Sequence, residues 1–211
     1  MNPNPLLKKL GFSDTDRLVI IHVDDVGMCH ASVQAFADLW EFGTISSGAV
    51  MVPCPWFRAV VDWARQHPEV DLGVHGTVNS EWDSYRWGPI STCDPTTGLI
   101  DEEGYLHKRE PAVQAGADPE AVRIEIEAQL NRALAAGLDV THLDTHMGTI
   151  THPRFIAGYL QLLGQARLPG LVPRLDAAGL RKLGLDEETA NLFAVLIRQL
   201  EAAGMPMPSN C

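Results

Sequence analysis

Six ionisable side chains in this sequence have the types and spacings that divalent metal sites use. They occur in three short groups, and each group lies within or directly after a run of apolar residues. The six residues are Asp24, Asp25, His75, His142, Asp144 and His146. Imidazole nitrogens together with carboxylate oxygens suit divalent ions such as Zn²⁺, Mn²⁺, Co²⁺ or Ni²⁺. The sequence therefore predicts a metal site with further carboxylates beside it.

The first group is the adjacent pair Asp24 and Asp25, which follows the apolar run at residues 18–23. Two neighbouring carboxylates at the end of a buried strand are costly unless a cation or a proton offsets their repulsion. A metal ligand next to a general base would use both. The alternative is that Asp25 caps a turn or helix while Asp24 is an ordinary surface carboxylate.

His75 forms the second group by itself, and His142, Asp144 and His146 form the third. The third group has alternate spacing, so an extended strand would project all three side chains to one face. We favour His142 as a residue that supports the metal ligands rather than as a ligand itself. In the alternative, His142 is a core residue hydrogen-bonded to the backbone and only His146 is functional. His75 follows a short apolar strand, and a single histidine there is compatible with a structural role as well.

The elements that would position these residues alternate between strands and helices. We expect strands at residues 18–23, 45–52, 71–75 and 140–146, and a short fifth strand at 171–174. We expect helices at residues 32–40, 56–66, 119–136 and 153–166, and a last one from Asp186 to about Ala203. This alternation predicts an α/β fold with a parallel sheet, either an open doubly wound sheet or a barrel. Both place their sites at the strand ends where the six residues gather.

We expect one domain over residues 1–211, with a long loop excursion at about 79–118. Loops of that length inside a compact domain are usually functional or disordered. The excursion contains Trp82, Tyr85, Arg86 and Trp87, which suit a sugar ring or pin the loop to the body through buried aromatic area. A complete eight-stranded barrel needs about 250 residues, so we expect the last strands of such a barrel to be missing from these 211.

The charge and composition of the sequence bear on which molecules the protein binds and where it is found. Sixteen basic and 27 acidic residues give a net charge of −11, which argues against nucleic acid or an anionic membrane surface as the main partner. The sequence has no apolar run of about 20 residues and no signal-peptide pattern at its N-terminus. Its four cysteines are scattered without metal or disulfide spacing. We therefore expect reduced thiols and a cytoplasmic protein.

The motifs of the three groups, taken in order, resemble those of the YdjC-like carbohydrate deacetylases, which include chitooligosaccharide and hopanoid-sugar deacetylases. The matching segments are Asp24-Asp25-Val26-Gly27, Gly73-Val74-His75 and Thr141-His142-Leu143-Asp144-Thr145-His146, followed by Pro153. The resemblance covers about residues 16–175. It implies a distorted (β/α) TIM-like barrel related to the polysaccharide deacetylase fold, incomplete in this chain.

The resemblance also implies a divalent metal ion held by Asp25, His75 and His146, with Asp24 as the catalytic base. Mg²⁺ or Zn²⁺ is the expected ion, with Mn²⁺, Co²⁺ or Ni²⁺ as alternatives. The implied reaction removes an N-acetyl group from an amino sugar or oligosaccharide and releases acetate.

Five further residues are expected to contact the substrate: Asp144, His142, Tyr85, Arg86 and Trp87. Two other functions stay open, a metallohydrolase of the same fold acting on another small amide or ester, and a non-catalytic carbohydrate-binding barrel. The expected partner is a small-molecule or oligosaccharide substrate, and a homodimer is compatible with a barrel of this size.

Overall fold

A computed structural model describes residues 4–182 and 184–208 of the chain. These residues divide into two compact units, one formed by residues 20–168 and the other by the segments on either side of it. The larger unit contains all six residues of the predicted metal site. Each unit is described by itself below.

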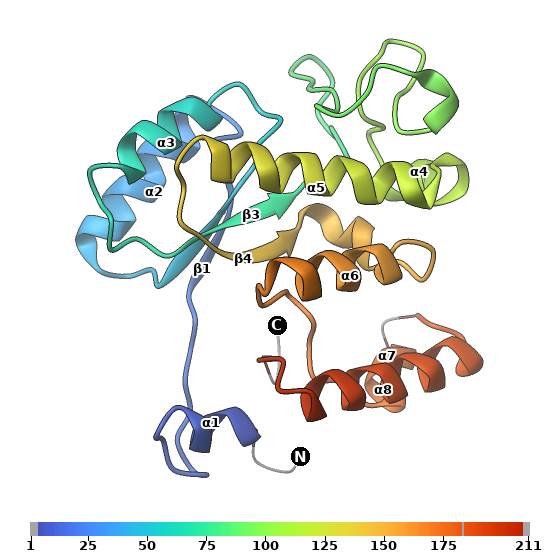
Figure 1. Cartoon of the computed structure of the whole chain (residues 1–211). Coiled ribbons are helices and arrows are strands. Elements are labelled where there is room, and N and C mark those ends of the chain that lie inside the picture. The colour runs from blue at the N-terminus through green and yellow to red at the C-terminus, as the bar shows by residue number, and fades with distance from the viewer. Residues whose placement is uncertain (1–3, 183, 209–211) are drawn as a thin grey trace. The chain divides into compact units, whose positions relative to one another are not determined.

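The larger unit is built on a parallel sheet of four strands (Figure 1). The strands are β1 (His22–Val26), β2 (Ser47–Val50), β3 (Leu72–Gly76) and β4 (Val140–Thr145). Their order in the sheet is β1-β2-β3-β4, and every neighbouring pair is parallel. This order follows the chain without the reversal that defines a doubly wound sheet, as in a segment of a (β/α) barrel. The predicted α/β class with a parallel sheet is therefore confirmed.

A helix follows each strand along the chain, and two of the helix ends show their sequence signals clearly. They are α2 (His30–Phe42), α3 (Phe57–Ala64), α5 (Pro119–Ala135) and α6 (Ile156–Ala166). Helix α2 ends at Gly43, which adopts the left-handed conformation with a φ of 78°. Helix α5 begins after Asp118, whose side chain accepts a hydrogen bond from the backbone N–H of Glu120. Helix α2 packs on β1, and α5 packs on β3 and β4 (Figure 1).

Two strand predictions were wrong. The strand predicted at 18–23 begins only at His22, and residues 18–21 are 49–77% exposed. Pairing with β2 starts at His22 opposite Ser47, so the preceding apolar residues have no neighbouring strand in the sheet. Residues 171–174 form no strand in the described structure. Pro169 and Pro173 remove the backbone donors that a strand would need there.

The excursion after β3 is mostly irregular, with a 3₁₀ turn at Pro95–Thr97 and a short helix, α4 (Glu110–Gly116). A fully buried carboxylate on α5 holds it in place. The side chain of Glu125 accepts hydrogen bonds from the backbone N–H groups of Ile90 and Ser91 and from the amide of Gln129. Gln129 in turn bonds to both the N–H and the carbonyl of Thr77. This buried network fixes the excursion to the segment that follows β3.

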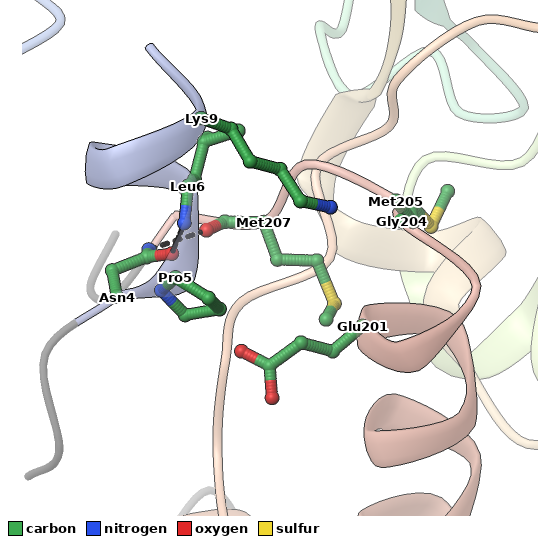
Figure 2. Close-up of a pocket in the computed structure, with 8 residues that line it drawn as sticks. All are labelled: Asn4, Pro5, Leu6, Lys9, Glu201, Gly204, Met205 and Met207. Atoms are coloured by element: carbon green, nitrogen blue, oxygen red, sulfur yellow. Dashed lines mark hydrogen bonds between the residues drawn. The ribbon is translucent and has the colours of Figure 1, made fainter. Parts of the chain in front are cut away.

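The smaller unit contains α1 (Pro5–Lys9), α7 (Ala177–Lys182) and α8 (Glu187–Ala202). Helices α7 and α8 pack against each other, and Asp186 caps α8 as predicted. The side chain of Asn4 caps α1 and also donates a hydrogen bond to the carbonyl of Met207 (Figure 2). Figure 2 shows the pocket that these residues line together with Lys9 and Glu201. Among the described residues, no helix is both long and apolar enough to span a membrane.

Candidate metal site

The backbone at the end of β1 is irregular where its two aspartates lie. The pairing register with β2 shifts between Val23 and Val26, and Asp25 lies in the left-handed region with a φ of 58°. A non-glycine residue in this region is uncommon, and strained residues of this kind cluster at active sites and ligand-binding sites. The two carboxylates contact different partners in adjoining groups. Asp24 approaches His22, whereas Asp25 approaches His75 and His146.

Three potential metal ligands meet at the carboxyl ends of β1, β3 and β4. Oδ1 of Asp25 lies 3.4 Å from Nε2 of His75 and 3.1 Å from Nδ1 of His146. Both histidines are buried, and their ring centroids are 5.3 Å apart. Among the described residues, the buried Oδ1 of Asp25 has no partner with hydrogen-bond geometry. One carboxylate oxygen and two imidazole nitrogens that converge in this way fit a divalent ion.

Each of these histidines also has a carboxylate at its other ring nitrogen. Nδ1 of His75 lies 3.2 Å from Oδ2 of Asp144, and Nε2 of His146 lies 3.0 Å from Oε2 of Glu81. Such carboxylates hold the ring orientation of metal-binding histidines and make them more basic. Sequence reasoning did not identify Glu81. The signal available was that Glu81 is the first acidic residue after His75, at the start of the excursion.

The protonation equilibria of the cluster reflect opposing effects of burial and charge. Burial by itself would raise the pKa of Asp25, but the imidazoles of His146 and His75 bring this pKa well below its usual range. Burial would lower the pKa of His75, but the carboxylates of Asp144 and Asp25 raise it to about 9. The pKa of His146 is raised in the same way by Asp25 and Glu81, against the effect of burial. Without a metal ion, therefore, the neighbouring carboxylates favour the protonated form of both imidazoles.

A second group of potential ligands, His22, Asp24 and Asp144, adjoins the first because Asp144 also contacts His75. Nε2 of His22 lies 3.4 Å from Oδ1 of Asp24 and 3.2 Å from Oδ2 of Asp144. The other nitrogen of His22, Nδ1, is 2.7 Å from the hydroxyl of Ser47. The side chain of Asp24 is 61% exposed, so it is accessible to water and substrate. The sequence had indicated no role for His22, which here contacts the predicted catalytic base.

His142 lies apart from the cluster of Asp25, His75 and His146. Its ring contacts His22 at a centroid distance of 5.1 Å, and its Nδ1 is 2.8 Å from the hydroxyl of Thr141. His22 contacts both His142 and Asp144, so these two side chains lie on the same side of β4, as their alternate spacing predicts. Strand β4 ends at Thr145, so this alternation does not extend to His146.

The aromatic and arginine residues of the excursion have different environments. Trp87 is buried, and its indole N–H donates to the carbonyl of Asn79 at 2.8 Å. The buried guanidinium of Arg86 pairs with Asp101 at 2.7 Å and thus holds the excursion together. Tyr85 donates its hydroxyl to the carbonyl of Met28, just after β1. The predicted substrate contacts of these three residues stay predictions.

The parallel fold, with carboxylate and imidazole groups meeting at the strand ends, defines an α/β protein with a metal-type site. The chain belongs to the YdjC-like protein family, whose model matches residues 18–209. It is 34% identical over 205 residues to a carbohydrate deacetylase of Thermus thermophilus. The matched region covers 95% of this chain and 72% of that protein. The predicted family resemblance is thereby confirmed.

A second relative is a carbohydrate deacetylase of Thermoanaerobacter pseudethanolicus, 25% identical over 169 residues, with 80% of this chain and 66% of that protein covered. Among solved structures, an Enterococcus faecalis protein described as a "putative cellobiose-phosphate cleavage protein" matches with a TM-score of 0.66 at 24% identity. That match covers 72% of this chain and 57% of the solved chain, and it supports the fold alone. The chain thus spans 57–72% of the length of these three proteins.

Proposed function

We propose that the chain is a metal-dependent hydrolase that removes N-acetyl groups from amino sugars or oligosaccharides. The observation that carries the proposal is the convergence of Asp25, His75 and His146 on one point beside the exposed carboxylate of Asp24. The family and the names of the curated relatives support the substrate class. The reaction consumes one water and yields acetate and a free amine.

Asp25, His75 and His146 would hold the divalent ion. When bound, such an ion supplies Lewis acidity toward the amide carbonyl of the substrate. Asp144 and Glu81 keep the two imidazoles in the required orientation through their second ring nitrogens. The same carboxylates favour the tautomers that carry the proton on Nδ1 of His75 and on Nε2 of His146. The nitrogens that face Asp25, Nε2 of His75 and Nδ1 of His146, are then free to bind a metal ion.

Asp24 is the proposed general base. Its carboxylate is exposed, while His22 lies 3.4 Å away and restrains its position. In this role Asp24 accepts a proton from the water that attacks the acetamide carbon. The bond between the carbonyl carbon and the nitrogen then breaks, and the proton that Asp24 took from the water passes to the leaving amine, so that Asp24 is again ionised.

The experiment is an acetate-release assay on N-acetylglucosamine and N-acetylated chitooligosaccharides, with the protein supplied with Zn²⁺, Mg²⁺, Mn²⁺, Co²⁺ or Ni²⁺. We expect acetate from at least one pair of metal and sugar. Asp24→Asn should lower kcat by about 100-fold or more while the protein keeps its bound metal. Asp83→Asn, a change at an exposed carboxylate on the same loop as Glu81, is the matched control and should behave as wild type. Equal acetate release by wild type and Asp24→Asn would contradict the assignment.

A further inference from the structure

Ser47 on β2 and His22 on β1 connect to the carboxylate proposed as the general base. The two residues are partners in the register of the strands. The hydroxyl of Ser47 lies 2.7 Å from Nδ1 of His22. The other ring nitrogen, Nε2, lies 3.4 Å from Oδ1 of Asp24 and 3.2 Å from Oδ2 of Asp144. The imidazole therefore joins a buried hydroxyl to two carboxylates.

The two carboxylates differ in how much else holds them. Oδ1 of the buried Asp144 accepts a hydrogen bond from the backbone N–H of Thr145, and its Oδ2 also lies 3.2 Å from Nδ1 of His75. The side chain of Asp24 is exposed, and His22 is the one residue of the described structure at ion-pair distance from it. The position of Asp24 therefore depends on His22 far more than that of Asp144 does.

The ring of His22 is held on two sides and presents Nε2 to the carboxylates. The ring of His142 contacts it edge-on at a centroid distance of 5.1 Å, and Ser47 contacts Nδ1. Ionised carboxylates only accept hydrogen bonds, whereas a hydroxyl can donate to Nδ1, so the ring proton belongs on Nε2. This nitrogen is buried and lies near both carboxylates without hydrogen-bond geometry to either. Because a substrate does not reach it, His22 acts on the reaction only through a carboxylate.

We propose that Ser47 and His22 form a positioning pair that holds the carboxylate of Asp24 in the orientation needed to accept a proton from the attacking water. The inference rests on the proposed function, in which Asp24 is the general base. A general base must lie within hydrogen-bond reach of the proton that it takes. A displacement of about 1 Å can lower the rate about 100-fold, so an exposed side chain in this role needs a fixed neighbour.

The test is the acetate-release assay on the metal-loaded chain, with two substitutions that separate the ring nitrogen from the ring. His22→Phe keeps an aromatic ring against His142 but removes both nitrogens. His22→Gln removes the ring but keeps an N–H as many bonds from Cα as Nε2 is. We expect His22→Phe to lower kcat about tenfold and leave KM within about twofold of wild type. His22→Gln should recover most of the lost kcat, whereas a role in packing alone predicts a larger loss in His22→Gln than in His22→Phe.

A double-mutant cycle identifies the carboxylate through which His22 acts. In the Asp24→Asn background, His22→Phe should change the residual kcat by less than about twofold, because no base is left to position. A tenfold loss in both backgrounds would overturn the proposal. The Zn²⁺ affinity of His22→Phe should stay within about twofold of wild type. A large loss of Zn²⁺ affinity would instead assign His22 to the support of Asp144 and His75, and would also overturn the proposal.

Ser47→Ala should lower kcat about threefold, because the ring then loses the partner of Nδ1. It should have no such effect in the Asp24→Asn background, and it decides the cycle if His22→Phe does not fold. His67→Phe is the matched control, at a histidine whose Nδ1 contacts the carbonyl of Trp63, and should behave as wild type.

The failure of the positioning pair and that of the proposed function give different results. Acetate release by wild type that is unchanged in His22→Phe and Ser47→Ala would overturn the pair and leave the proposed function standing. Absence of acetate release by wild type with every metal and sugar would overturn the proposed function and the pair with it.

Discussion

Oε2 of Glu81 lies 3.0 Å from Nε2 of His146. This contact joins the first part of the excursion to the end of β4, and the carboxylate and the imidazole each influence the charge of the other. Burial would raise the pKa of Glu81, but His146 lowers it, so the carboxylate is ionised where it meets the ring. Through Glu81, the excursion therefore contributes a residue to the candidate metal site.

Glu81→Gln should weaken metal binding about tenfold, because the amide keeps the shape of the side chain but removes the charge that makes His146 basic. Glu81→Ala should weaken it by about 100-fold, since the ring also loses its orientation. Competition titration with a chromophoric Zn²⁺ chelator measures both. Asp83→Asn, two residues away and exposed, is the control. Unchanged affinity in both Glu81 variants would show that Glu81 does not support His146.

Metal affinity should depend steeply on pH. His75 has a pKa of about 9 in the metal-free protein, above its ordinary value of 6.5, because Asp144 and Asp25 favour the imidazolium. A metal ion must displace this proton, so apparent affinity should rise by up to about tenfold per pH unit between pH 6.5 and 9 and level off above. Titration of the metal-free protein across this range tests the prediction. A flat profile would contradict it.

The same pKa shift makes the stability of the metal-free protein depend on pH. A raised pKa means that the folded state binds the proton more tightly than the unfolded chain does. This contribution is fully present below about pH 6.5 and is lost as the pH rises through 9. We expect the melting temperature of the metal-free protein to fall over this range. A melting temperature that rose from pH 6.5 to 9 would show that the carboxylates do not hold a proton on His75.

Gly73 illustrates how close packing supports the site. A methyl group on Gly73 would overlap the ring of His142, which lies across β3 at that point. Gly73→Ala should therefore lower the free energy of unfolding by about 1–3 kcal/mol. Gly164→Ala in α6, where the described structure leaves open space around the added methyl, should instead raise it by up to about 1 kcal/mol. Urea denaturation measures the free energy of unfolding of both variants. Equal values for Gly73→Ala and Gly164→Ala would contradict the packing argument.

The position of the site could be predicted because parallel strands bring their carboxyl ends to one edge. Asp25, His75 and His146 come from strand ends far apart in the sequence, and the structure brings them together. The helices were predicted for a similar reason, since their apolar spacing and their capping residues, such as Asp118 and Gly43, are local signals. Neither inference required knowledge of tertiary packing.

Features that depend on tertiary contacts were not visible in the sequence. The apolar residues before His22 resemble a buried strand, but burial depends on a neighbouring strand that begins only at Ser47. The contact between His142 and His22 could not be predicted either, because it joins two strands that are not neighbours in the sheet. Glu81 acts at the site because the excursion folds back toward His146, and this path is fixed by the buried Glu125 on α5.

The metal content of the purified chain tests the central claim most directly. After reconstitution with Zn²⁺ and removal of free ion, elemental analysis should find about one ion per chain in wild type. His75→Ala and His146→Ala should each lose it, while His67→Ala, on a histidine that contacts Trp63 away from the cluster, should retain it. Circular dichroism establishes that the variants are folded. A wild-type chain that binds no divalent ion, or variants that keep a full complement, would contradict the account.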